Sequence, residues 1–278
     1  MNAIEINVSP VLWHIGGLEV RWYGVMMALG VLVLILWAMN QIRRGAKISY
    51  DTLMGAALVG IPSGIIFARL LHVVDGPDNI HYYFSQPLRI IGGSGLTIYG
   101  AILGAALGVW IYSRFNKLNY GYLTDVITPG IILAQALGRV GCLFNGCCYG
   151  NAATIWPFNL FNIVYTNPDS YAYPIGAPFQ PTQFYEILFL LALFAVIMIF
   201  RSKFKPDGVQ FMFYLGMYSV WRIGIGFLRV GTPFAFGLEQ AQVIGIILAV
   251  ICFSQIIIRR RKMKLQPAAI EPAANNET

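Results

Sequence analysis

Charged residues are scarce in this sequence. Only 11% of the 278 residues are Asp, Glu, Lys or Arg, whereas a soluble globular domain has about 25%. Hydrophobic residues make up 57% of the chain, and its mean hydropathy is +0.64. The composition therefore excludes an ordinary soluble domain and indicates an integral membrane protein.

Cysteine and histidine are also few. Four cysteines, three of them within one short stretch, do not form the disulfide framework of a small secreted domain. No histidine is adjacent to them, and their spacing matches none of the usual zinc patterns. We expect Cys142, Cys147 and Cys148 to be small packing residues, with a reactive thiol as the less favoured alternative. No metal site is predicted.

The N-terminal segment lacks the basic and apolar regions of a signal peptide. No cleaved leader is therefore expected, and the first membrane helix must direct insertion. The formal net charge is +7, but the cations lie in short clusters beside apolar runs. Such clusters are typical of membrane topology and of contact with anionic lipid. We expect membrane lipids as partners, and no nucleic acid.

Seven apolar runs are candidate membrane spans, a structure that needs roughly 20 mostly apolar residues. They lie at about residues 22–39, 53–71, 96–112, 123–137, 184–200, 211–228 and 241–258. The third run contains Gly100, Gly104 and Gly108, a stripe of small residues that lets another helix approach closely.

Basic clusters follow the first, third, fifth and seventh runs. If each run crosses the membrane once, these clusters lie on one side, which the positive-inside rule makes cytoplasmic. The sequence thus predicts an all-α fold, a polytopic membrane helical bundle with seven transmembrane helices, the N-terminus outside and the C-terminus cytoplasmic. We expect one transmembrane domain over residues 1–264, with a small outer-face head at about 138–180 and a disordered cytoplasmic tail at 265–278.

The stretch GRVGCLFNGCCYG, from Gly138 to Gly150, puts a cation, an amide, three thiols and four glycines in the middle of a mostly apolar chain. A cation near hydrocarbon costs several kcal/mol, so Arg139 should face a polar cavity or an anionic partner. The glycines permit left-handed backbone and close approach, which favours an irregular segment around a ligand.

Two further arginines, Arg222 and Arg229, lie seven residues apart on the sixth expected span. This spacing puts them on one helix face as a ladder of positive charge. With Arg139 they suit a phosphate, and a phospholipid headgroup is its natural source in a membrane. The alternative is that Arg222 pairs with Glu186 and that Arg229 reaches the outer headgroups.

Other polar side chains are expected near the outer helix ends. Gln183 and Glu186 share a face at the start of the fifth span, and Glu186 could simply neutralise an arginine. Asp125 is another acidic candidate partner for Arg139. Tyr23 and Tyr99 each precede a glycine, and an interfacial aromatic belt explains them as well as a site does.

The stretch GRVGCLFNGCCYG resembles the signature of the bacterial prolipoprotein diacylglyceryl transferases. The matching positions are Gly138, Arg139, Gly141, Asn145, Gly146 and Gly150. The resemblance runs from about residue 20 to 258 through ordered motifs that contain Tyr23, Arg69, Tyr99, Asp125, Gln183, Glu186, Arg222 and Arg229. The chain departs from the family pattern at Cys147, where members often have an acidic residue, and at Tyr99, where many have His.

This resemblance implies transfer of the diacylglyceryl group of phosphatidylglycerol to the lipobox cysteine thiol of a preprolipoprotein. The products would be a thioether and glycerol 1-phosphate, in the first step of lipoprotein maturation at the bacterial inner membrane. The implied catalytic residues are Arg139, Arg222 and Tyr99. The implied substrate-binding residues are Arg139, Asn145, Tyr23, Arg229, Gln183 and Glu186. No cofactor is required.

Two alternatives stay open at this point. The same arginines could hold a phospholipid headgroup in a lipid-binding or transport protein without chemistry. A related transferase with a different lipid donor or acceptor is the other possibility. No internal repeat of the kind that many transporters contain is visible, which counts against a carrier.

Overall fold

The computed structural model describes residues 3–16, 18–74, 85, 98–152, 161–229, 231 and 233–265. The chain divides into two compact units. The first unit consists of Met1–Trp37 and Thr124–Thr278, and the second of Ala38–Leu123. The two units are described separately below.

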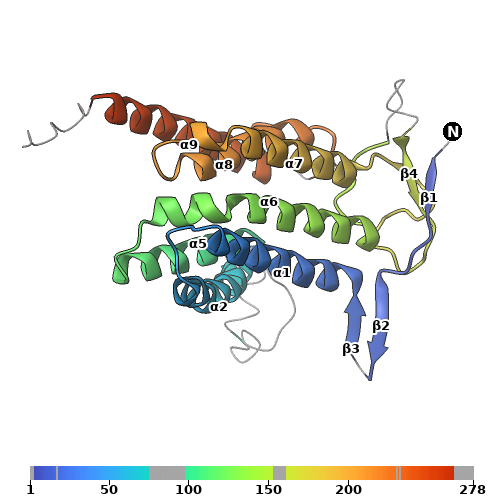
Figure 1. Cartoon of the computed structure of the whole chain (residues 1–278). Helices are drawn as coiled ribbons and strands as arrows, with labels where there is room; N and C mark the ends of the chain where they lie inside the picture. Colours follow the sequence, from blue (N-terminus) through green and yellow to red (C-terminus); the bar gives the residue numbers. More distant parts are fainter. Residues whose placement is uncertain are drawn as a thin grey trace, which may run out of the picture. The chain divides into compact units, whose positions relative to one another are not determined.

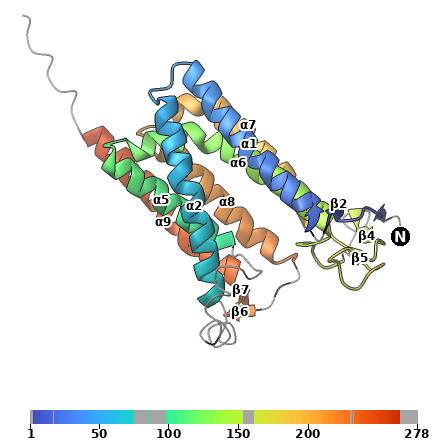
Figure 2. The ribbon, with the colours of Figure 1, turned by 90° about the horizontal axis from the view of Figure 1, so that it is seen from below.

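Helices make up most of both units. The first unit contains most of α1 (Trp22–Arg43) and α6 (Tyr120–Asn145), together with α7 (Thr182–Ile199), α8 (Val209–Gly226) and α9 (Gln240–Leu265). The second unit is built on α2 (Tyr50–Val74) and α5 (Ile98–Phe115). Within the first unit, α1, α6 and α7 run alongside one another in both ribbon views (Figure 1 and Figure 2).

Five of the described helices are long and apolar enough to cross a membrane, namely α1, α2, α6, α7 and α9. Their surfaces carry large apolar side chains that water would solvate poorly. Leu58 on α2 is 71% exposed and Val250 on α9 is 62% exposed. Apolar surface on this scale is suited to contact with lipid. The chain is therefore a mostly helical, multi-pass membrane protein.

Each of the seven expected runs coincides with a helix among the described residues. The predicted end of the fourth run is wrong, and the error affects the candidate site. The fourth run was expected to end near residue 137, but α6 continues to Asn145 and includes Arg139 and Cys142. The glycines at 138 and 141 are thus helical rather than part of an irregular segment.

A close helix contact explains why glycine is tolerated inside α6. A Cβ on Gly141 would lie 3.1 Å from Met26 Cβ and 3.2 Å from Tyr23 Cα, both on α1. Further along the same pair, a Cβ on Gly30 of α1 would lie 3.0 Å from the Ala134 carbonyl oxygen. Small residues therefore bring the two backbones together, as is common between membrane helices.

The glycine stripe predicted in the second unit has the expected role. A Cβ on Gly108 of α5 would lie 2.6 Å from Ser63 Oγ, and one on Gly100 would lie 2.7 Å from Ala68 Cα. A Cβ on Gly104 would collide with Phe67. The stripe on α5 therefore packs directly against α2, as small residues do in membranes.

The chain also contains short strands, which corrects the expectation of an all-α fold. In the first unit β1 (Ile4–Ile6) pairs in parallel with β4 (Ile163–Tyr165), which pairs antiparallel with β5 (Pro178–Phe179). Hairpin β2 (Val11–Ile15) and β3 (Leu18–Arg21) precedes α1, and β6 (Pro233–Ala235) pairs with β7 (Leu238–Glu239).

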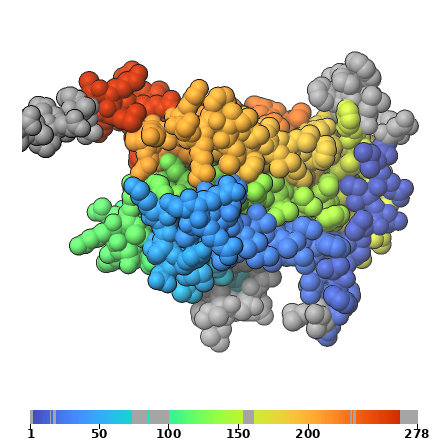
Figure 3. Space-filling view, in the orientation of Figure 1, coloured from blue at the N-terminus to red at the C-terminus, as the bar shows by residue number. Residues whose placement is uncertain are grey.

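The three-stranded sheet forms the core of the expected head. Ile163, Tyr165, Ala172 and Phe179 are buried together there. The N-terminal strand therefore belongs to the head, an association that the sequence did not predict. Figure 3 shows the dark blue N-terminal residues beside the yellow-green head residues in the first unit.

Several predictions fall outside the described residues. The expected tail lies there except for Leu265, which ends α9. Residues 153–160 of the expected head and residues 96–97 of the third run lie there too.

Candidate functional site

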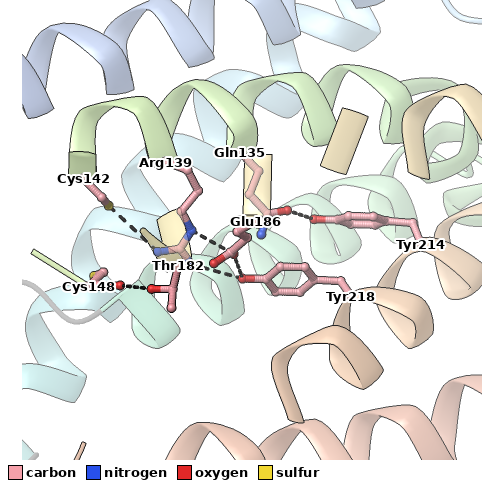
Figure 4. A network of polar contacts seen from close by, with 8 residues as sticks. All are labelled: Gln135, Arg139, Cys142, Cys148, Thr182, Glu186, Tyr214 and Tyr218. Atoms are coloured by element: carbon pink, nitrogen blue, oxygen red, sulfur yellow. Dashed lines mark hydrogen bonds and ion pairs between the residues drawn. The ribbon is translucent and has the colours of Figure 1, made fainter. Parts of the chain in front are cut away.

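The candidate site lies in the first unit where α6, α7 and α8 converge. Gln135, Arg139 and Cys142 occupy one face of α6, since they are three or four residues apart. Thr182 and Glu186 share a face of α7 for the same reason. Figure 4 shows Gln135 turned toward Tyr214 of α8, and Arg139 and Glu186 turned toward Tyr218 of the same helix.

A closed triangle of polar side chains forms the centre of the site. Arg139 Nε lies 2.8 Å from Glu186 Oε1, and its Nη2 donates a hydrogen bond to the Tyr218 hydroxyl at 3.2 Å. That hydroxyl donates to the same Glu186 oxygen at 2.7 Å (Figure 4). Glu186 is only 1% exposed. A buried carboxylate is tolerable only with such partners, so the triangle fixes Arg139 in place.

This pairing decides between the earlier alternatives. The alternative pairing of Arg222 with Glu186 is wrong, because Glu186 pairs with Arg139. The prediction that Asp125 lies near the head as a candidate partner for Arg139 is also wrong. Asp125 lies fourteen residues earlier on the same helix, about 21 Å away at 1.5 Å per residue. Its carboxylate instead accepts backbone N–H bonds from Gly208 and Phe211 at the start of α8.

The predicted ladder of Arg222 and Arg229 does not form. Helix α8 ends at Gly226, and Arg229 lies beyond it in a β-bridge with Gly150. Arg222 remains on the helix, one turn after Tyr218. Its Nη1 is buried and has no hydrogen-bond partner among the described residues. That donor is available to an anion.

The turn after α6 brings the three cysteines together. The Sγ atoms of Cys142, Cys147 and Cys148 all lie within 4.8 Å of one another. Arg139 Nη1 lies 3.9 Å from Cys142 Sγ, and Asn145 Nδ2 lies 3.6 Å from Cys147 Sγ. The sequence spacing did not predict this convergence.

Helix α7 anchors the same turn. Thr182 Oγ1 donates to the Cys148 carbonyl at 2.6 Å, and Gln183 Nε2 donates to the Cys147 carbonyl at 2.6 Å. Hydrogen bonds from the thiols of Cys142 and Cys147, followed by the charges of Arg229 and Arg139, lower the pKa of the Cys148 thiol. The turn is thus fixed by α7, and the charges of Arg139 and Arg229 act on Cys148 within it.

The remaining predicted residues have separate placements. Asn145 Oδ1 and Gln183 Oε1 are buried without a hydrogen-bond partner among the described residues. Tyr23 lies in the first turn of α1 beside Gly141. Tyr99 is in the first turn of α5 in the second unit, and its side chain lies outside what the structure describes.

Sequence reasoning missed four residues around the triangle. Tyr214 donates to Gln135 Oε1 at 2.7 Å, Tyr218 closes the triangle, and Thr182 holds the cysteine turn. A signal existed for three of them. Tyr214, Tyr218 and Arg222 recur every four residues on α8, as Gln135 and Arg139 do on α6, so each helix has a polar stripe in an apolar run.

The fold and site define a helical membrane protein with a buried, arginine-centred polar site. The sequence profile of prolipoprotein diacylglyceryl transferases matches residues 10–258. The chain belongs to the prolipoprotein diacylglyceryl transferase family.

Relatives cover nearly the whole chain. A protein of Dehalococcoides mccartyi strain 195 is 54% identical over 260 residues, which are 94% of this chain and 97% of the relative. A protein of Clostridium botulinum strain Langeland is 33% identical over 264 residues, covering 92% of this chain and all of the relative. Both are named phosphatidylglycerol–prolipoprotein diacylglyceryl transferase.

Proposed function

We propose that this protein transfers the diacylglyceryl group of phosphatidylglycerol to the lipobox cysteine thiol of preprolipoproteins. The observation that carries this proposal is 54% identity to a relative of that name over 94% of the chain. The buried polar site supports it, because a purely structural bundle has no need of a buried arginine donor, here Arg222 Nη1, without a partner among the described residues.

The proposed setting is the bacterial inner membrane. The chain crosses it seven times as one transmembrane domain of residues 1–264, with α5 and α8 added to the five long apolar helices. The basic clusters support a topology with the N-terminus and the head outside and the C-terminal tail in the cytoplasm. The cysteine turn then lies at the outer end of α6, where a secreted substrate can reach it.

The proposed reaction is a substitution at the glycerol carbon. The acceptor thiolate forms a sulfur–carbon bond as the carbon–oxygen bond to phosphate breaks, and glycerol 1-phosphate leaves. A thiol has a pKa of about 8.5, so deprotonation needs an electropositive environment. Stabilising the departing phosphate is the other requirement, which charge-assisted hydrogen bonds meet well in a dry site.

We assign the two helical arginines different parts of this task. Arg222 supports phosphate binding through its buried Nη1, which has no partner among the described residues. Arg139 is already paired with Glu186, so we propose that it supplies positive potential and a fixed geometry. Arg229 follows α8, and its charge acts on the thiol of Cys148 in the turn after α6. We propose that it binds the headgroup at the site entrance.

We propose supporting roles for the other predicted residues. The unpartnered oxygens of Asn145 and Gln183 accept hydrogen bonds from substrate hydroxyl or amide groups. Glu186 orients Arg139. We propose that Tyr23 contacts substrate beside Gly141 and, on the family resemblance alone, that Tyr99 assists catalysis.

The test is a reconstituted transfer reaction. Purified full-length protein in detergent is mixed with phosphatidylglycerol and a lipobox peptide, and mass spectrometry detects the diacylglyceryl adduct. A peptide with Ser in place of the lipobox Cys is the control. Lipid binding without any adduct would contradict the enzyme and favour a lipid-binding protein. An adduct formed only from another phospholipid would favour the related transferase.

A further inference from the structure

The thiol of Cys142, in the last turn of α6, and those of Cys147 and Cys148, just after it, have a geometry suited to one metal ion. Their Sγ atoms all lie within 4.8 Å of one another. Three sulfurs bound to one zinc ion at the usual 2.3 Å in tetrahedral geometry are about 3.8 Å apart. Small side-chain movements therefore suffice to close the cluster around zinc.

The backbone of the turn is shaped to bring these thiols together. Gly146 has φ 70°, and Cys148, which carries a side chain, has φ 69°. A left-handed conformation at such a residue costs on the order of 1 to 3 kcal/mol and is retained mainly where surrounding structure imposes it. Thr182 and Gln183 impose it here by binding the two cysteine carbonyls. Backbone strain of this kind is common at binding sites.

The surrounding charges suit a zinc–thiolate group. Three thiolates and one Zn²⁺ together carry a single negative charge. Arg139 Nη1, 3.9 Å from Cys142 Sγ, offsets that charge. Asn145 Nδ2, 3.6 Å from Cys147 Sγ, donates to a second sulfur. Hydrogen bonds of this type orient metal ligands and tune the metal.

We propose that Cys142, Cys147 and Cys148 bind a zinc ion and that the fourth zinc position accepts the thiol of the acceptor peptide. This rests on the proposed function, because it names the group that activates the acceptor. Catalytic zinc sites have three protein ligands and one open position, whereas structural sites have four ligands. Among the described residues, no fourth Cys, His, Asp or Glu joins this group.

The step balances without an oxidant or reductant. The acceptor thiol releases its proton to water when its sulfur binds the zinc. The sulfur electron pair then forms the bond to the glycerol carbon of phosphatidylglycerol. The electron pair of the broken carbon–oxygen bond leaves with glycerol 1-phosphate. The neutral thioether product binds zinc more weakly than a thiolate, so it dissociates.

The first measurement is the zinc content of the full-length protein, purified in detergent with added ZnCl₂ and then desalted. We expect about one zinc ion per chain and loss of most of it in Cys147→Ser and Cys148→Ser. Cys252→Ser is the matched control, since Cys252 is a buried cysteine of α9 outside the cluster, and it should retain the zinc. Equal zinc in wild type and Cys147→Ser, or none in wild type, overturns the proposal.

A second measurement uses only the wild-type chain, so that misfolded variants do not matter. Co²⁺ replaces zinc, and the sulfur-to-cobalt charge-transfer absorption reports the thiolates. A lipobox peptide with Cys should increase this absorption, and the same peptide with Ser should not. An identical response to both peptides overturns acceptor binding at the metal.

Transfer assays separate this proposal from the proposed function. Removal of zinc with a chelator should lower transfer at least tenfold, and ZnCl₂ should restore it. Zinc-free protein that transfers at the zinc-loaded rate overturns the metal's role and leaves the transferase intact. Zinc held by the three cysteines without any transfer at full loading overturns the transferase, while the metal site stands.

Discussion

Helix α6 carries a charged side chain near each end, Asp125 and Arg139. The two side chains have different kinds of partner. Asp125 accepts hydrogen bonds from the backbone N–H groups of Gly208 and Phe211, at 2.7 and 2.8 Å. Arg139 contacts the side chains of Glu186 and Tyr218. The Asp125 carboxylate is thus bound by the backbone at the start of α8, whereas Arg139 is bound by side chains alone.

This difference distinguishes a structural end of α6, the scaffold at Asp125, from a candidate functional end, the site at Arg139. At the Asp125 end, a carboxylate satisfies the N–H groups that a helix start leaves without partners. At the other end, buried polar atoms remain without partners among the described residues, including Arg222 Nη1, Asn145 Oδ1 and Gln183 Oε1. Such atoms are costly in an apolar interior unless a ligand binds them. Four predictions test this contrast.

The largest effect is expected for Arg139→Ala. It leaves Glu186 as an unpaired buried charge, which should lower the free energy of unfolding by about 3 to 5 kcal/mol and lower transfer at least tenfold. Thermal unfolding and transfer are measured on the same preparations. Adding Glu186→Gln removes the unpaired charge and should restore stability without restoring transfer. Recovery of transfer in the double variant would reduce Arg139 to a structural residue.

Asp125→Ala should affect stability alone. Loss of the two backbone hydrogen bonds to a charged group should cost roughly 2 to 3 kcal/mol. Transfer per folded molecule should stay near the wild-type value, because the site lies at the other end of α6. Unfolding curves and rates normalised to folded protein measure the two quantities. A tenfold loss of normalised transfer would refute the separation of scaffold and site.

Arg222→Gln should show the reverse behaviour. Since Nη1 has no partner in the described protein, unfolding should change by no more than about 0.5 kcal/mol. A lost charge-assisted contact to phosphate should raise the KM for phosphatidylglycerol about tenfold, which corresponds to about 1.4 kcal/mol. An unchanged KM would remove Arg222 from the phosphate site.

The smallest effects come from a matched pair of tyrosines. Tyr218→Phe removes the hydrogen bond to Glu186 and the weaker one accepted from Arg139, at 2.7 and 3.2 Å, and Tyr214→Phe removes the hydrogen bond to Gln135 at 2.7 Å. Each should destabilise by about 1 kcal/mol. Only Tyr218→Phe should slow transfer, by about fivefold, because Tyr218 touches the charged pair. Equal transfer rates in the two variants would show that the triangle has no part in catalysis.

The helices could be predicted from the sequence because long apolar runs leave few other structures possible in a membrane. The role of the glycine stripe of α5 could also be predicted, since small residues on one face of a membrane helix allow close packing against another helix. The polar residues Arg139 and Glu186 were identified for a similar reason, as charges in apolar surroundings require partners.

The pairing of those charges was not predictable, and one error explains why. The glycines at 138 and 141 suggest irregular backbone in the sequence, but both are helical, and Gly141 instead lets Tyr23 and Met26 of α1 approach α6 closely. A helix through Asn145 would have excluded Asp125 as a partner at once. The cysteine cluster depends on left-handed backbone at Gly146 and Cys148, which spacing alone does not reveal.

The parallel pairing of β1 with β4 has a consequence for synthesis. Ile4 lies beside Ile163, and Thr166 Oγ1 donates to Glu5 Oε1 at 2.8 Å, 161 residues along the chain. At ribosomal rates of about 5 to 20 residues per second, the first strand waits on the order of 10 s for its partner. The nascent N-terminus is therefore an unpaired β-edge during that interval, open to chaperones and proteases until β4 has been made.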